Sequence, residues 1–149
     1  MNISEILELN ERAKEDGKNF SRARQLFSQI QSEPGRHFIG IVGPRGVGKT
    51  VLLKQLALSE PDSFYLSADT LALKQLALSE PDSFYLSADT LAESDLFQIA
   101  RILSEQYKIN IFLVDEIHFC KTYAKDLKKI YDFLNIRVVF TSSVSLSLF

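Results

Sequence analysis

The sequence predicts an α/β fold of three layers, in which helices cover both faces of a mostly parallel β-sheet. Short apolar runs alternate along the chain with longer segments of helical periodicity, a pattern that is typical of parallel sheets. A glycine-rich turn joins the first apolar run to the helical segment that follows it. Residues 1–35 carry helical patterns alone, so we expect an N-terminal helical segment followed by an α/β core over residues 36–149.

Length and composition fit one domain, since the chain has 149 residues of which 46% are hydrophobic. A formal net charge of -2 gives no global positive field for nucleic acid. The longest apolar runs, such as residues 109–114, are too short to cross a bilayer, and the N-terminus lacks the pattern of a secretory signal. Cys120 is the single cysteine, so no internal disulfide can form. We therefore expect a cytoplasmic protein with no membrane segment and no clear nucleic-acid patch.

The first elements follow from the spacing of apolar residues. Residues 3–15 and about 20–31 place apolar side chains at helical intervals. Residues 37–42 form a short apolar run that predicts a buried parallel strand. Residues 51–58 predict a helix that ends near Pro61.

The later elements repeat this order of helix and strand. Residues 93–106 predict a helix, and residues 109–114 predict a β-branched strand. Residues 121–129 predict a second helix, and residues 137–140 a further short strand. Acidic residues stand among the lysines of 121–129, so a solvated face is favoured there over a basic contact for a partner.

The glycine-rich turn carries the clearest chemistry. Residues 43–50 read GPRGVGKT and match the phosphate-binding loop G-x-x-x-x-G-K-[ST] in full. The glycines let successive backbone N–H groups converge on phosphate oxygens, and the start of the following helix adds further donors. Lys49 is expected to contact the phosphates, and the Thr50 hydroxyl to bind Mg²⁺. The residues expected to bind the nucleotide are Gly43, Pro44, Arg45, Gly46, Val47, Gly48, Lys49, Thr50 and Val51.

Two acids end the strand that is predicted near residue 111. In a protein with a phosphate-binding loop, Asp115 is expected to hold Mg²⁺, directly or through water. Glu116 is expected to orient the attacking water and to remove its proton. An acid in this catalytic position favours transfer of the γ-phosphoryl group to water, which is hydrolysis, over its transfer to another acceptor.

Hydroxyl side chains follow the last predicted strand, at Thr141, Ser142 and Ser143. The carboxyl end of a parallel strand faces the ligand crevice, so these residues form a candidate sensor of the γ-phosphate. Hydroxyl groups also cap turns, and both interpretations remain open. His118 and Cys120 lie two residues apart without further histidines or cysteines nearby, so we expect ordinary packing there rather than a zinc site.

A tandem repeat interrupts the core. Residues 53–72 and 73–92 are identical over twenty residues. A recent in-frame duplication, an engineered insertion and a sequence-assembly error all remain open as its origin. The surplus residues of this repeat are expected between about residues 64 and 82. They form either a loop or, as we favour, an extra strand at 64–68 and a short helix at 71–78, at the sheet edge. The strand-like segment 84–89 leads directly into the next predicted helix.

The remaining sequence separates classes of nucleotide-binding protein. The Asn-Lys-x-Asp segment with which GTPases recognise guanine is missing from the sequence, and so is the LSGGQ-like signature of transporter ATPases. The segments GPRGVGKTVLLKQLA, FYLSADT, IFLVDEIHF and RVVFTSS closely resemble the prokaryotic AAA-type ATPases in which the ATPase domain precedes a domain of unknown function. The resemblance covers about residues 36–145, with Ser142 at a position where the family usually has glycine.

That resemblance implies further expectations. Residues 43–50 bind the phosphates of ATP, Asp115 binds magnesium, Glu116 is the catalytic base, and residues 141–143 form the first sensor. The family's strand order is 5-1-4-3-2, which puts the duplicated strand at an edge. The chain stops after the fourth strand, so the resemblance implies a sheet incomplete at its C-terminal end, without the arginine fingers that the family carries further on.

We therefore expect Mg²⁺-dependent ATP binding and hydrolysis that is slow or dependent on a protein partner or on self-association. The alternatives are a nucleotide-binding module that does not hydrolyse and an inactive gene fragment.

Overall fold

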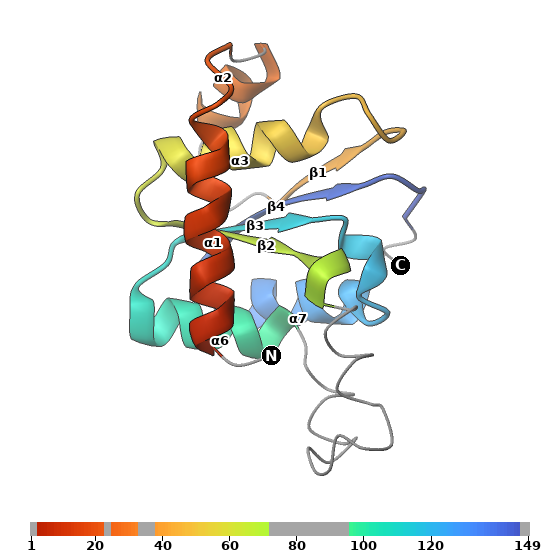
Figure 1. The fold of residues 1–149 in the computed structure, drawn as a ribbon. Coiled ribbons are helices and arrows are strands. Elements are labelled where there is room, and N and C mark those ends of the chain that lie inside the picture. The colour runs from red at the N-terminus through yellow and green to blue at the C-terminus, as the bar shows by residue number, and fades with distance from the viewer. Residues whose placement is uncertain (1–2, 23–24, 33–37, 72–95, 147–149) are drawn as a thin grey trace, which may run out of the picture.

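Four parallel strands form the centre of the protein (Figure 1). The computed structural model describes residues 3–22, 25–32, 38–71 and 96–146. In these ranges the sheet has the order β1-β4-β3-β2, and each neighbouring pair is parallel. The strands are β1 (Ile39–Val42), β2 (Ser63–Ser67), β3 (Ile111–Asp115) and β4 (Arg137–Ser142). The predicted α/β class is confirmed, and the strand order matches the 1-4-3-2 part of the order that the resemblance implies.

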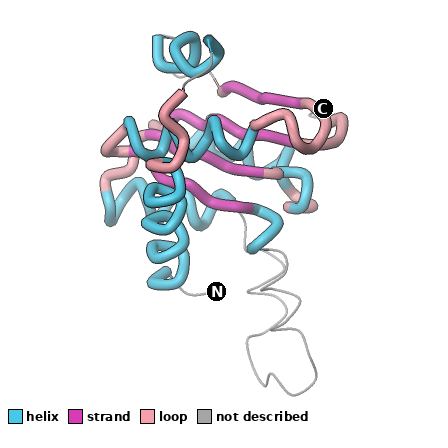
Figure 2. The backbone as a smooth tube through the Cα atoms, turned by 45° about the horizontal axis from the view of Figure 1, so that its top comes forward, coloured by secondary structure: helices cyan, strands magenta, loops and turns pink. Residues whose placement is uncertain are grey.

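Helices cover both faces of this sheet, as Figures 1 and 2 show. One face packs on α3 and the other on α6 and α7, which gives the predicted three layers. Alternation along the strands produces this arrangement, because Tyr65, Leu113 and Val139 point to one side. The helices are α1 (Ile3–Gly17), α2 (Gln25–Ser32), α3 (Lys49–Ser59), α6 (Leu96–Tyr107) and α7 (Tyr123–Phe133), with a short 3-10 turn η1 (Ile117–Phe119).

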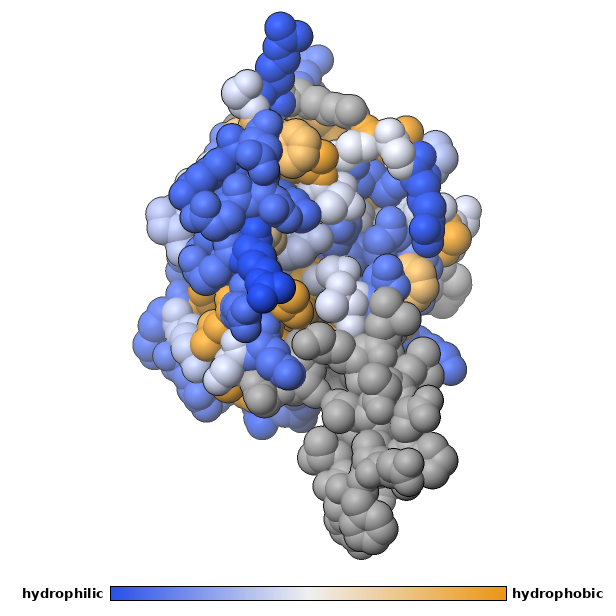
Figure 3. Space-filling model, viewed as in Figure 1, coloured by the Kyte–Doolittle hydropathy of each residue, from blue (hydrophilic) through white to orange (hydrophobic). Residues whose placement is uncertain are grey.

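The helix α1 runs beside β2 at the outer edge of the sheet (Figure 1). Its apolar residues join both halves of the core, with Ile6 in one cluster and Ala13 in the other. Its outward side is hydrophilic (blue in Figure 3). Gly17 packs so closely on α3 that a Cβ there would lie 2.7 Å from the carbonyl oxygen of Lys54. This contact fixes the C-terminal end of α1 against the helix that follows the glycine-rich turn.

The first copy of the repeat supplies the edge strand. Residues 53–59 complete α3, residues 63–67 form β2, and residues 68–71 form a helical turn. The strand expected at 64–68 was predicted to be an extra strand at the sheet edge. The structure instead gives it the place of β2, where it is hydrogen-bonded directly to β3. The connection between α3 and this strand is only a few residues long. Because short connections join neighbouring elements, the first copy is the one that lies next to β3. The segment 84–89 and most of the helix expected at 71–78 lie outside the described residues.

Element bounds otherwise differ from the predicted ones by a few residues. The helix expected at 20–31 begins later, at Gln25, and residues 18–22 form a connection instead. The helix expected at 121–129 extends to Phe133. No helix in the described ranges is long and apolar enough to cross a membrane.

Candidate nucleotide site

The glycine-rich turn joins the carboxyl end of β1 to the first residue of α3, Lys49. Gly46 and Gly48 have φ angles of 82° and 94°, a region that glycine enters without the steric cost of a Cβ. The N–H of Gly43 donates to the carbonyl oxygen of Ser142 at 3.1 Å, which ties the turn to the end of β4. The sequence therefore places glycine where the backbone requires it, and the N-terminus of α3 opens into this turn.

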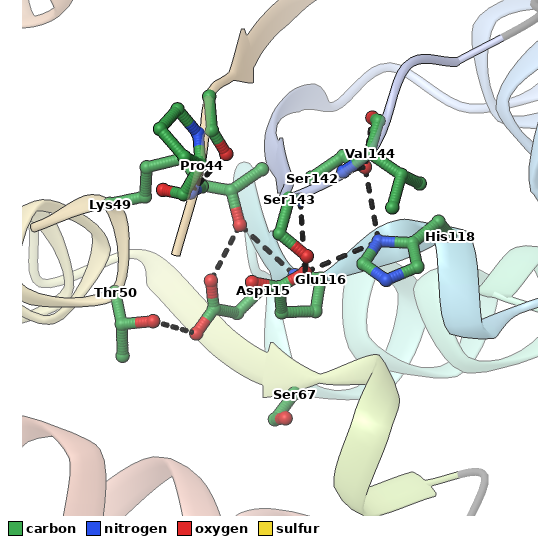
Figure 4. Close-up of polar contacts among 12 residues, drawn as sticks. Pro44, Lys49, Thr50, Ser67, Asp115, Glu116, His118, Ser142, Ser143 and Val144 are labelled. Carbon is green, nitrogen blue, oxygen red and sulfur yellow. Dashed lines mark hydrogen bonds and ion pairs between the residues drawn. The ribbon is translucent and has the colours of Figure 1, made fainter. Parts of the chain in front are cut away.

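The ammonium group of Lys49 lies inside the turn (Figure 4). Its Nζ donates to the carbonyl oxygens of Gly43 at 2.6 Å and Pro44 at 2.7 Å, and the residue is buried. A buried ammonium group requires such partners because its desolvation is costly. The positive charge is thereby held at the centre of the loop, among the backbone groups predicted to bind phosphate.

Asp115 ends β3 beside the start of α3 and is only 3% exposed. Its Oδ2 accepts hydrogen bonds from the Thr50 hydroxyl at 2.7 Å and from the Tyr65 hydroxyl at 2.8 Å. Its Oδ1 accepts a third from the Thr141 hydroxyl at 2.5 Å. Hydroxyl groups from α3, β2 and β4 thus fix the orientation of one buried carboxylate.

This donor set fits a hard divalent cation, since Thr50 and Asp115 offer oxygen ligands side by side. Among the described residues, no group of three or more histidine, cysteine, aspartate or glutamate side chains could hold a metal alone. Mg²⁺ commonly uses one or two protein oxygens and completes its octahedral shell with phosphate and water. The arrangement is therefore suited to a cation that arrives with a nucleotide.

Glu116 adopts an unusual backbone conformation directly after β3. Its φ and ψ angles are 53° and 50°, a left-handed geometry that costs about 1–2 kcal/mol for a residue with a Cβ. Its N–H donates to the Thr141 hydroxyl at 3.0 Å. Its Oε2 accepts hydrogen bonds from the N–H and the hydroxyl of Ser143, at 3.1 and 2.9 Å. The strained turn directs the carboxylate toward the end of β4.

His118 also contacts this carboxylate, a partner that the sequence did not indicate. Its Nδ1 lies 3.2 Å from Oε2 of Glu116 and 3.0 Å from the hydroxyl oxygen of Ser142 (Figure 4). The histidine is two residues beyond Glu116 on η1, so the turn brings its ring back to the acid. Cys120 points elsewhere and contacts Thr122 and Asp126. Burial raises the pKa of the Cys120 thiol, an effect that the Thr122 hydrogen bonds partly offset.

The hydroxyl residues at the end of β4 have different partners. Thr141 contacts Asp115, and Ser143 contacts Glu116. Ser142 faces His118 and also forms a local turn, because its hydroxyl donates to the carbonyl of Val144 and accepts the Val144 N–H. Ser142 thus caps a turn, whereas Thr141 and Ser143 contact the two acids, and a sensor role for this segment stays a prediction.

A cavity of about 390 Å³ lies beside the N-terminus of α3. Gln55 holds one wall in place, since its side-chain amide donates to the carbonyl oxygens of Phe20 at 3.2 Å and Arg22 at 2.9 Å. The cavity is lined by Phe20, Ser21, Arg22, Gly48, Val51, Leu52 and Gln55. The sequence indicated Gly48 and Val51 in this group, but the wall from residues 20–22 has no local sequence pattern.

The parallel sheet and its phosphate-binding loop define a P-loop protein of the α/β class. Comparison with family models is more specific, because the model of a family described as "AAA domain" matches residues 35–149. The chain belongs to this AAA domain family. A comparison with curated proteins gives no match.

Two solved structures share the fold. One is AMPPCP-bound DnaA from Aquifex aeolicus, with a TM-score of 0.51 and 18% identity over 86% of this chain and 41% of that chain. The other is described as a DNA replication initiation factor, with a TM-score of 0.53 and 16% identity over 86% of this chain and 41% of that chain. The chain thus spans about two fifths of each of these structures, and the likeness establishes the fold alone.

Proposed function

We propose that this AAA domain binds ATP together with Mg²⁺ and hydrolyses the γ-phosphate, with Glu116 as the general base. One observation carries the proposal: Asp115 and Glu116 are adjacent acids with separate hydrogen-bond environments at the mouth of the phosphate-binding loop. The Asp115 carboxylate accepts hydrogen bonds from Thr50 of that loop, from Tyr65 and from Thr141, whereas the Glu116 carboxylate accepts hydrogen bonds from Ser143. One acid is thereby suited to a cation and the other to a water molecule.

The loop supplies the phosphate site in this proposal. Lys49 exchanges its two carbonyl partners for phosphate oxygens, which keep its buried charge compensated. The N–H groups at the start of α3, with the positive end of the helix dipole, contribute further donors. Thr50 and Asp115 hold Mg²⁺, which neutralises the charge that develops on the β- and γ-phosphates when it is bound.

The base site occupies the neighbouring cavity. Apolar surface from Val51, Leu52 and Phe20 suits a planar base. The cavity adjoins Gly48, so a base there lies close to the phosphates in the loop. The lack of the guanine-reading Asn-Lys-x-Asp segment favours adenine.

Glu116 then acts on the attacking water. Its hydrogen bonds from Ser143 and its contact with His118 all fall on Oε2, so we assign the proton transfer to Oε1. The same contacts also favour a second candidate, a module that binds nucleotide and signals without turnover, if they hold the whole Glu116 carboxylate away from the water. Turnover in this proposal depends on a partner or on a second copy of the chain, which would bring an arginine to the γ-phosphate.

Paired measurements of binding and turnover test the proposal. Glu116→Gln is expected to bind a fluorescent ATP analogue with Mg²⁺ as the wild type does, and to lose ATP hydrolysis. Glu105→Gln, a matched change at an exposed position of α6, is expected to alter neither. Equal hydrolysis by Glu116→Gln and the wild type excludes Glu116 as the base, whereas binding without turnover in the wild type favours the signalling module.

A further inference from the structure

Tyr65 lies in the middle of β2 and reaches into the candidate magnesium site. The residue is 7% exposed, and its ring packs with Leu113 and Val139 on the α3 side of the sheet. Its hydroxyl donates to Oδ2 of Asp115 at 2.8 Å. Thr50 donates to the same oxygen, so Tyr65 is one of two donors that orient it.

The phenol acts in this contact as a donor. A phenol is protonated at neutral pH and can donate a hydrogen bond, whereas an ionised carboxylate can only accept one. The Tyr65 hydroxyl therefore offers its hydrogen to Oδ2 of Asp115. Thr50 is expected to turn its oxygen toward a cation, whereas the Tyr65 contact can remain when the cation binds.

The backbone of Tyr65 is fixed from α1. As β2 is an edge strand in the described sheet, the outward N–H of Tyr65 has no strand to pair with. The side-chain Oδ1 of Asn10 accepts it at 2.8 Å, and Asn10 is only 4% exposed. An ion pair between Asp16 and Lys54, at 3.0 Å, helps to hold α1 on α3. A continuous set of contacts therefore runs from α1 through Tyr65 to Asp115.

We propose that Tyr65 is a positioning residue for Asp115, and that Asn10 fixes Tyr65 so that the N-terminal helix forms part of the magnesium site. The inference rests on the proposed function, in which Asp115 holds Mg²⁺. Partners that orient a metal-ligating carboxylate typically change metal affinity by about 10–100-fold when they are removed. Loss of the Tyr65 hydroxyl leaves Oδ2 with Thr50 alone, the donor that turns away when the cation binds.

Tyr65→Phe removes this single hydroxyl, and the repeat offers a matched control. Tyr85→Phe makes the same change in an identical stretch of twenty residues. Binding of a fluorescent ATP analogue is measured first in EDTA and then during a titration with MgCl₂. Tyr65→Phe is expected to keep the affinity in EDTA and to raise the Mg²⁺ concentration for half-maximal tightening by about tenfold. Tyr85→Phe is expected to match the wild type in both measurements.

Asn10→Ala is the second variant, since Asn10 acts on Asp115 only through Tyr65 and the variant remains informative if Tyr65→Phe does not fold. It is expected to shift the Mg²⁺ titration in the same direction, with affinity in EDTA unchanged. A shift of less than about twofold in both variants overturns the inference, and so does a shift in Tyr85→Phe alone. A wild type that does not bind the analogue contradicts the proposed function, whereas normal Mg²⁺-dependent binding by Tyr65→Phe contradicts this inference only.

Discussion

Thr141 links the two acids of the site, because its hydroxyl oxygen lies 2.5 Å from Oδ1 of Asp115 and accepts the N–H of Glu116 at 3.0 Å. One buried hydroxyl thus fixes a side chain and a backbone group from adjacent residues. Its position at the end of the central strand β4 makes it rigid, since that strand is paired on both sides.

Thr141→Val is expected to lower the free energy of unfolding by about 1–3 kcal/mol, because it leaves a buried carboxylate oxygen and a backbone N–H without this partner. Chemical denaturation measures the change. Thr141→Ser retains the hydroxyl and is expected to recover most of the stability. A Thr141→Val variant as stable as the wild type, beside a Thr141→Ser variant that loses stability, contradicts the role given to the hydroxyl and assigns the effect to packing of the methyl group.

His118→Ala is expected to reduce kcat while the affinity for the ATP analogue stays unchanged, because the contacts of the ring with Glu116 and Ser142 orient the proposed base. His118→Gln keeps a side chain able to hydrogen-bond Glu116 and Ser142, and is expected to retain more activity. Steady-state kinetics with direct binding separates the two quantities. A rise in kcat for His118→Ala contradicts the orienting role, and instead indicates that the histidine holds Glu116 away from the water.

Gly46→Ala tests the backbone of the loop. A Cβ added at Gly46 would have no atom of the described residues within 4 Å, so the cost is conformational and arises from its φ of 82°. We expect a loss of about 1–2 kcal/mol in the free energy of unfolding, with weaker nucleotide binding as the loop shifts. Thermal unfolding and analogue binding measure both effects. Unchanged stability and affinity contradict the requirement for a left-handed residue here.

Cys120 is expected to react slowly with iodoacetamide at neutral pH, because burial raises the pKa of its thiol and the thiolate is the reactive form. The native thiol keeps its proton at pH values where an unfolded cysteine loses it. Its contribution to stability is therefore complete below the ordinary pKa of 9.0 and is lost as the pH rises above that value. Alkylation rates of native and urea-unfolded protein, measured from pH 7 to 10, check the difference. Equal rates contradict the effect of burial.

The sequence predicted those parts of the fold and of the candidate site that are made of residues close together in the chain. The phosphate-binding loop and the acids at the end of β3 depend on consecutive residues, so their positions could be assigned without the fold. Short apolar runs likewise predicted the parallel strands. The sequence alone could not show which of the two identical copies forms the strand beside β3, because both have the same residues. The structure places the first copy in β2.

Contacts between distant segments were beyond this reasoning. Tyr65 and Asp115 are separated by 50 positions and meet because β2 and β3 are neighbours in register. A tyrosine in a buried strand gives no sign of such a partner in the sequence alone. The proximity of His118 to Glu116 could have been suspected, since a turn follows the strand, but the left-handed backbone at Glu116 has no local signal.

Thermal unfolding of the full chain with and without Mg²⁺-ATP tests the central claim most directly, with Lys49→Ala beside the wild type and Lys125→Ala as the matched control on α7. At a nucleotide concentration 100 times its Kd, binding stabilises the folded state by about 2.7 kcal/mol. We predict a rise in Tm for the wild type and Lys125→Ala, and none for Lys49→Ala. A wild type whose Tm does not change, or an equal rise in Lys49→Ala, contradicts a functional phosphate site in this loop.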